Sequence, residues 1–193
     1  SARRRELLMG REGAPDRSGD SIVAGGPHGA IPHHQPTERP IAVGDLLKID
    51  FGALFDGYNA DCTRTFIVAA DPADWQEQIH AVVAAAQQAG MEALAPGVSG
   101  QQVDAAARAV IQDAGYGEFY SHGLGHGVGL QIHEVPFLGP TSTNTVEARV
   151  PLTVEPGIYL PDRGGVRIED TLVVLDHGVE ILTDFPRDLA RVG

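Results

Sequence analysis

This chain has little cysteine, little positive charge and no long apolar stretch, and each shortage narrows the kind of protein it can be. Cys62 is the only cysteine among 193 residues, so an internal disulfide is impossible, which fits a reducing compartment. With 14 basic and 26 acidic residues the formal net charge is -12, which disfavours nucleic acid and anionic membranes as partners. No apolar run of about 18 residues and no signal-peptide pattern is present, so we expect a soluble, cytoplasmic protein.

The chain has, by contrast, ample material for a folded core. Apolar residues make up 42% and charged residues 21%, values typical of globular domains. Strand-like segments at 21–24, 46–54 and 58–68 precede two amphipathic helices, the second capped by Ser99 with Gln102, and strand-like segments at 150–154 and 165–175 follow. This order predicts an α+β fold with helices on one face of a sheet. We expect one domain over residues 1–193, with 1–20 the remnant of a longer N-terminal region.

Two aspartates, Asp50 and Asp61, lie in neighbouring apolar segments that Asp56-Gly57 separates. Asp-Gly between alternating apolar runs is a strong signal for a β-hairpin. In such a hairpin the two carboxylates fall on one face, opposite or diagonal to each other and about 5–8 Å apart. Two carboxylates at such a short distance repel each other unless a positive charge lies between them. Cys62 then points to the other face, which indicates core packing rather than a nucleophile.

Three further residues complete a possible ligand set: His126, Glu155 and Glu169, each in a glycine-flanked apolar setting. Four carboxylates and one imidazole favour Mn²⁺, Fe²⁺ or Co²⁺ over a thiolate zinc site. Two such ions need bridging carboxylates, and a hydroxide held between them is a nucleophile at neutral pH. Histidines can then transfer a proton to the leaving nitrogen and stabilise the developing oxyanion.

Each of these residues also has an ordinary structural interpretation. A single carboxylate is more often a surface or turn residue than a ligand, and glycine-rich stretches around histidines are usually turns. Asp61 and Arg64 could equally form an ion pair along one strand. Only the combination of residues indicates a site.

The motifs that contain these residues resemble a known family. They are GDLLKIDFGA at 44–53, GYNADCTRT at 57–65, HGLGHGVG at 122–129 with IHE at 132–134, TVEPG at 153–157 and GVRIED at 165–170. In this order and spacing they resemble the prolidase (Xaa-Pro dipeptidase) and aminopeptidase P branch of the methionine-aminopeptidase-like metallopeptidases. The resemblance covers nearly the whole chain.

The resemblance implies the pita-bread fold, a curved antiparallel sheet with helices on its outer face and two halves related by a pseudo-twofold axis. It also implies two divalent ions in the cleft, Mn²⁺ first, with Co²⁺, Fe²⁺ or Zn²⁺ as alternatives. By matching motif, Asp50 would chelate one ion, and His126 with Glu155 the other. Asp61 and Glu169 would bridge them.

The remaining expected site residues also come from the resemblance. Glu155 would accept a proton from the bridging water, and His133 would stabilise the oxyanion. His33 matches a histidine that approaches the scissile amide nitrogen, whereas its neighbour His34 matches no fixed position and is interpreted as structural or surface. The resemblance places His122 and Arg167 near the substrate and the bridging glutamate.

The activity this implies is hydrolysis of the bond between an N-terminal residue and proline, in dipeptides more than in longer peptides. A bond to proline is a tertiary amide without N–H, so it needs a dedicated peptidase. Arg167 beside Glu169 favours this branch over methionine aminopeptidases. Three alternatives stay open: a methionine aminopeptidase, a hydrolase of a non-peptide C–N bond, and a catalytically silent peptide-binding module. A homodimer is a further possibility.

Overall fold

The computed structural model describes residues 2–19, 21–35 and 37–193, and side chains from Leu7 onward within these ranges. The elements before the central helices are α1 (Ala2–Arg11), β1 (Asp16–Arg17), β2 (Ile22–Gly25), η1 (Gly26–Ala30), β3 (Leu46–Phe51), β4 (Ala53–Phe55), β5 (Tyr58–Asn59) and β6 (Cys62–Val68). Then come α2 (Asp74–Glu92), α3 (Gly100–Asp113), η2 (Gly117–Phe119), β7 (Gly125–Gly127), β8 (Glu134–Leu138), β9 (Pro151–Val154), β10 (Gly157–Leu160), β11 (Gly164–Arg167), β12 (Asp170–Val174), β13 (Val179–Ile181) and β14 (Arg191–Val192). The predicted α+β class is confirmed.

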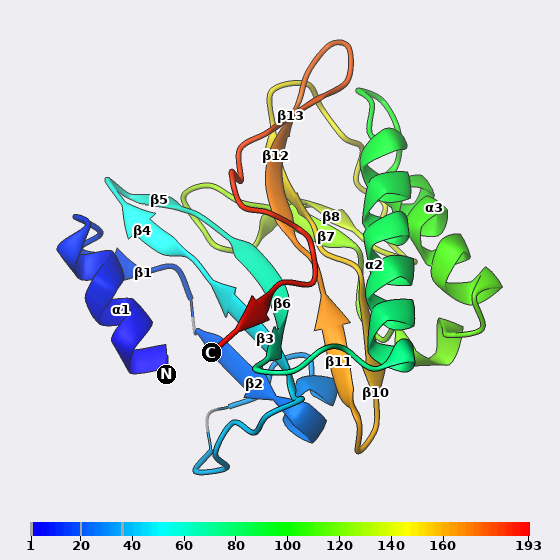
Figure 1. The fold of residues 1–193 in the computed structure, drawn as a ribbon. Coiled ribbons are helices and arrows are strands. Elements are labelled where there is room, and N and C mark those ends of the chain that lie inside the picture. The colour runs from blue at the N-terminus through cyan, green and yellow to red at the C-terminus, as the bar shows by residue number, and fades with distance from the viewer. Residues whose placement is uncertain (1, 20, 36) are drawn as a thin grey trace.

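The strands form four sheets, and Figure 1 shows how they curve around one side of the helices. Their orders are β14-β6-β3-β2, β13-β12-β9-β7-β8, β10-β11 and β1-β4-β5. The pairing of β14 with β6 is parallel, whereas the other strand pairings within the described ranges are antiparallel. The expected single curved sheet is therefore divided into pieces. Asp50 and His126 lie on strands of the two larger pieces, and four other residues predicted for the site directly adjoin strands of these pieces: Asp61, His133, Glu155 and Glu169.

The hairpin predicted for 46–68 is present. In the ladder between β3 and β6, Asp50 lies opposite Thr63, so Asp61, just before β6, is the diagonal neighbour of Asp50. The turn between β4 and β5 has φ of 50° at Asp56 and 84° at Gly57, the two positive values that a tight hairpin turn requires. Strand β3 ends at Phe51 and β4 begins at Ala53, and the residue between them must be glycine because a Cβ at Gly52 would lie 1.7 Å from the Ala60 carbonyl oxygen.

Helices α2 and α3 lie side by side and cover the sheets on one face (Figure 1). Ser99 accepts the Gln102 N–H at 3.2 Å and Gln102 Oε1 accepts the Ser99 N–H at 3.2 Å, so the predicted capping box is confirmed. Helix α2 approaches the sheet closely at Gly90, where a Cβ would lie 3.0 Å from Leu124. Neither helix, nor any other in the described ranges, has the length and apolar character needed to cross a bilayer.

One prediction of a strand is wrong. The segment 165–175 is not continuous, because β11 ends at Arg167 and β12 begins at Asp170. Strand β11 pairs with β10, an element the sequence pattern did not reveal, whereas β12 pairs with β9. At the break, the Glu169 N–H donates to the Thr63 carbonyl oxygen at 3.1 Å. This bridge carries Glu169 to the β3–β6 hairpin.

A buried guanidinium holds this junction together. Arg64 pairs with Asp170 at 2.6 Å, both side chains being almost fully buried, so the alternative pairing of Arg64 with Asp61 is wrong. Arg64 also donates to the carbonyl oxygens of Thr63 and Glu169. Arg64 thus binds β6 to the segment that carries Glu169.

Removing one partner of this pair should destabilise the fold. We expect Asp170→Asn to lower the free energy of unfolding by about 3–5 kcal/mol, because the buried Arg64 charge loses its counterion. Urea unfolding followed by circular dichroism measures the change. The control is Asp71→Asn, whose carboxylate is 96% exposed and lies 3.6 Å from Arg191. Equal effects of the two substitutions would contradict this role of the buried pair.

Candidate metal centre

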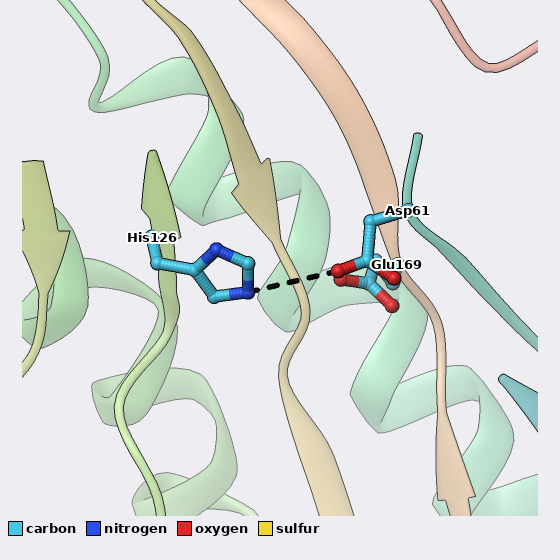
Figure 2. Close-up of side chains that lie close together, drawn as sticks. All are labelled: Asp61, His126 and Glu169. Atoms are coloured by element: carbon cyan, nitrogen blue, oxygen red, sulfur yellow. Dashed lines mark ion pairs between the residues drawn. The ribbon is translucent and has the colours of Figure 1, made fainter. Parts of the chain in front are cut away.

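Three predicted ligands meet at the centre of the molecule. Asp61, His126 and Glu169 each offer one ligating atom, and these atoms all lie within 4.8 Å of one another. Figure 2 shows the His126 ring directed from β7 toward the two carboxylates, with the His126 Nε2 to Asp61 Oδ2 distance at 3.8 Å. Asp61 precedes β6 and Glu169 occupies the break between β11 and β12, so three separate segments build the cluster.

Glycines on both sides allow His126 to lie inside the sheet. A Cβ at Gly125 would lie 2.0 Å from the Thr153 carbonyl oxygen, and one at Gly127 would lie 2.4 Å from the Val135 carbonyl oxygen. The alternative that these glycines form a turn is therefore wrong, since they belong to a buried strand. His126 Nδ1 lies 3.0 Å from the Gly127 carbonyl oxygen, which leaves Nε2 to face the carboxylates.

Thr63 orients Glu169, and the sequence analysis gave it no role. Its hydroxyl donates to Glu169 Oε2 at 2.6 Å and accepts from Arg167 Nε at 3.2 Å. One threonine thus connects the arginine to the carboxylate at a buried position. Thr63 lies within the GYNADCTRT motif, but its side-chain partner comes from a strand break that the motif does not reveal.

The other two predicted ligands lie beside this cluster. Glu155 Oε1 lies 3.2 Å from His126 Nε2, and its Oε2 lies 3.8 Å from Arg167 Nε. Asp50 is in close contact with Arg167 Nη2. Arg167 therefore faces both carboxylates, while Asp61 and Glu169 face His126.

Three further histidines surround the carboxylates. His133 packs edge-on against His126 with ring centroids 4.4 Å apart, and His33 is exposed. His122 Nε2 lies 2.7 Å from the Tyr159 hydroxyl, which also accepts from Arg167 Nη1 at 3.1 Å. Tyr159 is thus a site residue that the sequence analysis missed, because no motif or spacing marked it.

All the residues predicted for the site line one cavity of about 620 Å³: His33, Asp50, Asp61, His122, His126, His133, Glu155, Arg167 and Glu169. Residues that were not predicted also line it: a mainly apolar wall formed by Ile132 and by 137–141, and an N-terminal group formed by Ser18, Gly19, Ile22 and Gln35. By contrast, His34 lies outside this lining, is buried, and stacks on His28 with centroids 4.4 Å apart. Of its two interpretations, structural or surface, the structural one is confirmed.

Burial and mutual repulsion shape the charge of the carboxylates. Burial raises the pKa of Asp61 and of Glu169 well above their usual values, and neighbouring carboxylates raise them further. Burial also raises the pKa of Glu155, but the hydrogen bond and charge of His126, together with the charges of Arg167 and His122, outweigh this and lower that pKa to about 2. Buried, crowded oxygen donors around one imidazole form a donor set that fits a divalent cation.

Three cavity histidines have shifted pKa values. Burial lowers the pKa of His126, but its contacts with Glu155, Gly127 and Asp61 together raise it, whereas His122 and His133 are neutral near pH 7. Burial lowers the pKa of His122 to about 4. Burial, and then the neighbouring His126, lowers the pKa of His133 below its usual value. Neutral imidazoles can donate or accept a hydrogen bond without adding repulsion toward cations.

Carboxylates gathered around an imidazole in a cleft with neutral histidines are typical of metal-dependent hydrolases. The profile of metallopeptidase family M24 matches residues 2–176, and the chain belongs to this family. The chain is 42% identical over 184 residues to the Xaa-Pro dipeptidase of Pyrococcus furiosus, covering 95% of this chain and 53% of that protein. The solved prolidase structure from P. furiosus matches with a TM-score of 0.93.

Two other solved structures are similar to the same degree. An Xaa-Pro dipeptidase from Bacillus anthracis is 41% identical with a TM-score of 0.96, over 99% of this chain and 54% of that one. An X-Pro aminopeptidase from Thermotoga maritima is 40% identical with a TM-score of 0.96 and the same coverage. The predicted resemblance and the pita-bread fold are therefore confirmed. The chain spans about half the length of the curated relatives it matches.

The crowded carboxylates predict how stability depends on pH. A carboxyl group with a raised pKa in the folded state stabilises it fully below the unfolded-state pKa of about 4, and this contribution is lost as the pH rises through the raised value. With EDTA present, we therefore expect the free energy of unfolding to fall as the pH rises from about 4 toward neutral. Urea unfolding across this range measures it.

Addition of Mn²⁺ should reverse this loss, by about 2.7 kcal/mol at a concentration 100 times its dissociation constant. Asp61→Asn should flatten the pH dependence and remove most of the stabilisation by Mn²⁺, since it removes one buried charge and one ligand. Asp162→Asn, in an exposed turn with φ of 60° that asparagine also adopts, is the matched control. Stabilisation by Mn²⁺ that is unchanged in Asp61→Asn would contradict the assignment.

Proposed function

We propose that this chain is the catalytic part of a metal-dependent peptidase that cleaves the bond between an N-terminal residue and proline. The observation that carries the proposal is the convergence of all five predicted ligands and of His33, His122, His133 and Arg167 on one cavity. The names of the relatives support the same reaction, since the proteins from P. furiosus and B. anthracis are called Xaa-Pro dipeptidases.

For the ligands we propose the assignment that the motifs imply. Asp50 binds one ion, His126 and Glu155 bind the other, and Asp61 and Glu169 bind both. The proximity of Asp61, His126 and Glu169 supports the central part of this arrangement. The oxygen-rich donor set favours Mn²⁺, with Co²⁺, Fe²⁺ or Zn²⁺ as alternatives. Such ions, when bound, would activate a water molecule and polarise the scissile carbonyl group.

The residues around the ligands would orient the substrate and move its protons. Glu155, whose pKa is lowered to about 2 by His126 and the other positive neighbours, is ionised at neutral pH, and we assign it the role of proton acceptor that the motif implies. Neutral His133 would donate a hydrogen bond to the developing oxyanion. Exposed His33 would approach the amide nitrogen of the scissile bond. His122 is held by Tyr159, and Arg167 holds Asp50 in place.

The apolar wall supports proline as the residue after the cleaved bond. Ile132, Phe137 and Pro140 lie in the same cavity as His133 and offer a surface for a pyrrolidine ring rather than for a charged side chain. A cavity of about 620 Å³ accommodates a dipeptide, and we favour dipeptides over longer substrates. Longer peptides are the second candidate substrate, because the X-Pro aminopeptidase from T. maritima is equally similar to this chain.

Other parts of the prediction remain proposals. A cytoplasmic location is consistent with the single buried thiol, Cys62, whose pKa burial raises to about 12. A homodimer and a single catalytic domain over residues 1–193 stay predictions. A silent binding module is disfavoured because all five ligand positions keep ligating side chains.

Hydrolysis assays test the proposed reaction directly. The chain is stripped of metal, reloaded with Mn²⁺, and assayed with Xaa-Pro dipeptides, an Xaa-Pro-Xaa tripeptide and a Met-Ala peptide. We expect metal-dependent cleavage confined to proline substrates, with dipeptides preferred. Cleavage of the Met-Ala peptide alone would identify a methionine aminopeptidase, and absence of cleavage by folded, metal-loaded protein would contradict the proposal.

Substitution of the two proposed bridging ligands gives an independent test. Asp61→Ala or Glu169→Ala should lower kcat/KM at least roughly a thousandfold, the effect of several kcal/mol of lost transition-state stabilisation. Asp162→Ala, in the exposed turn, is the control and should leave kcat/KM unchanged. Full activity of either ligand variant would refute the site assignment.

A further inference from the structure

Lys48 is the only lysine among the 193 residues and is fully buried. It lies on β3, two residues before Asp50. Burying an ammonium group costs free energy unless hydrogen bonds replace its hydration. Neither the motifs nor the proposed mechanism gives this cation a role.

The Lys48 amino group directs its hydrogen bonds to one short segment. Nζ donates to the carbonyl oxygens of Gly29 at 3.2 Å, Ile31 at 2.9 Å and Pro32 at 3.2 Å. Burial lowers the pKa of Lys48 to about 6, but three carbonyl acceptors around one nitrogen match the three N–H donors of the protonated form, so we assign the ammonium form. The same nitrogen lies 4.7 Å from the centroid of the Tyr159 ring. The compact ammonium group thus holds three carbonyl groups of residues 29–32 together.

The same segment has two other fixed contacts. The Pro32 carbonyl oxygen also accepts from Arg167 Nη1 at 3.1 Å. Gly29 packs directly on β11, since a Cβ at Gly165 would lie 2.4 Å from the Gly29 carbonyl oxygen. After the segment, His34 is buried. Both neighbours of His33 are therefore held in place.

His33 itself is exposed and lines the cavity. We propose that Lys48 is a positioning residue that holds residues 29–32 in place and thereby aims His33 at the substrate. The role of His33 rests on the proposed function, whereas the holding of the segment rests on the contacts of Lys48 alone. Lys48 is not among the residues that line the cavity, so its effect on the reaction would pass through His33.

Lys48 could also affect activity through Asp50 rather than through His33, and experiments have to distinguish the two effects. Residues two apart on a strand share a face, so Lys48 and Asp50 lie on the same side of β3. Loss of the lysine charge could therefore change ion binding at Asp50. That route predicts a changed Mn²⁺ requirement, whereas positioning of His33 predicts an unchanged one.

Hydrogen–deuterium exchange tests the holding of the segment without any substrate. We expect Lys48→Met, which keeps the side-chain length but removes the donors, to speed exchange in a peptide covering 28–35 and to leave α2 and α3 unchanged. Lys48→Gln retains two N–H donors and should be intermediate. Arg108→Met is the matched control, since Arg108 donates to the carbonyl oxygens of Tyr120 and His122 instead. Exchange at 28–35 equal to wild type in Lys48→Met would overturn the proposal.

A double-mutant cycle tests the action through His33. Lys48→Met should lower kcat/KM for an Xaa-Pro dipeptide roughly 10- to 100-fold, mainly through kcat, as expected for a misplaced group. In a His33→Ala background the same substitution should cost less than about twofold, because coupled residues are not additive. In a His133→Ala background it should keep its full effect.

The outcomes separate this inference from the proposed function. An equal loss in the wild-type and His33→Ala backgrounds, or a changed Mn²⁺ concentration for half-activation, would refute positioning through His33. If the wild-type chain cleaves no proline peptide, the proposed function fails, while exchange at 28–35 still decides whether Lys48 holds the segment.

Discussion

The constraint on which this structure depends is the crowding of four carboxylates, Asp50, Asp61, Glu155 and Glu169, at one partly buried position. Such groups repel each other, and burial makes each charge more costly. His126 and Arg167 compensate part of this charge, through contacts with Glu155 and with Asp50 respectively. Burial and the remaining repulsion raise the pKa values of Asp50, Asp61 and Glu169. A divalent cation is the ligand that such a cluster binds best.

The fold brings these charges together by breaking its own strands. Glu169 reaches the site because the chain leaves β11 and bridges to Thr63 before it enters β12. The buried pair of Arg64 with Asp170 holds this break, one residue beyond the ligand. Stability of the core and geometry of the site are thus linked at one junction, so substitutions in the buried pair should affect both.

Local sequence signals predicted the parts that depend on local interactions. Asp-Gly fixed the hairpin that makes Asp50 and Asp61 diagonal neighbours, and Ser99 marked the start of a helix. The break at 168–169, strand β10, Tyr159, Thr63 and the wall at 137–141 depend on pairing between distant segments. The hydrophobic periodicity of a short sequence window does not predict which distant segments pair. Residue types and local setting indicated the five possible ligands, and the motif resemblance added His33, His122, His133 and Arg167. Their common cavity became visible only in three dimensions.

The central claim is that five ligands bind two divalent ions within one cavity. Anomalous diffraction from crystals of the Mn²⁺-loaded chain tests it most directly, because it locates each ion independently of activity. We expect two peaks, both contacted by Asp61 and Glu169, with Asp50 beside one and His126 and Glu155 beside the other. A single peak, or ions bound elsewhere on this acidic chain, would contradict the account.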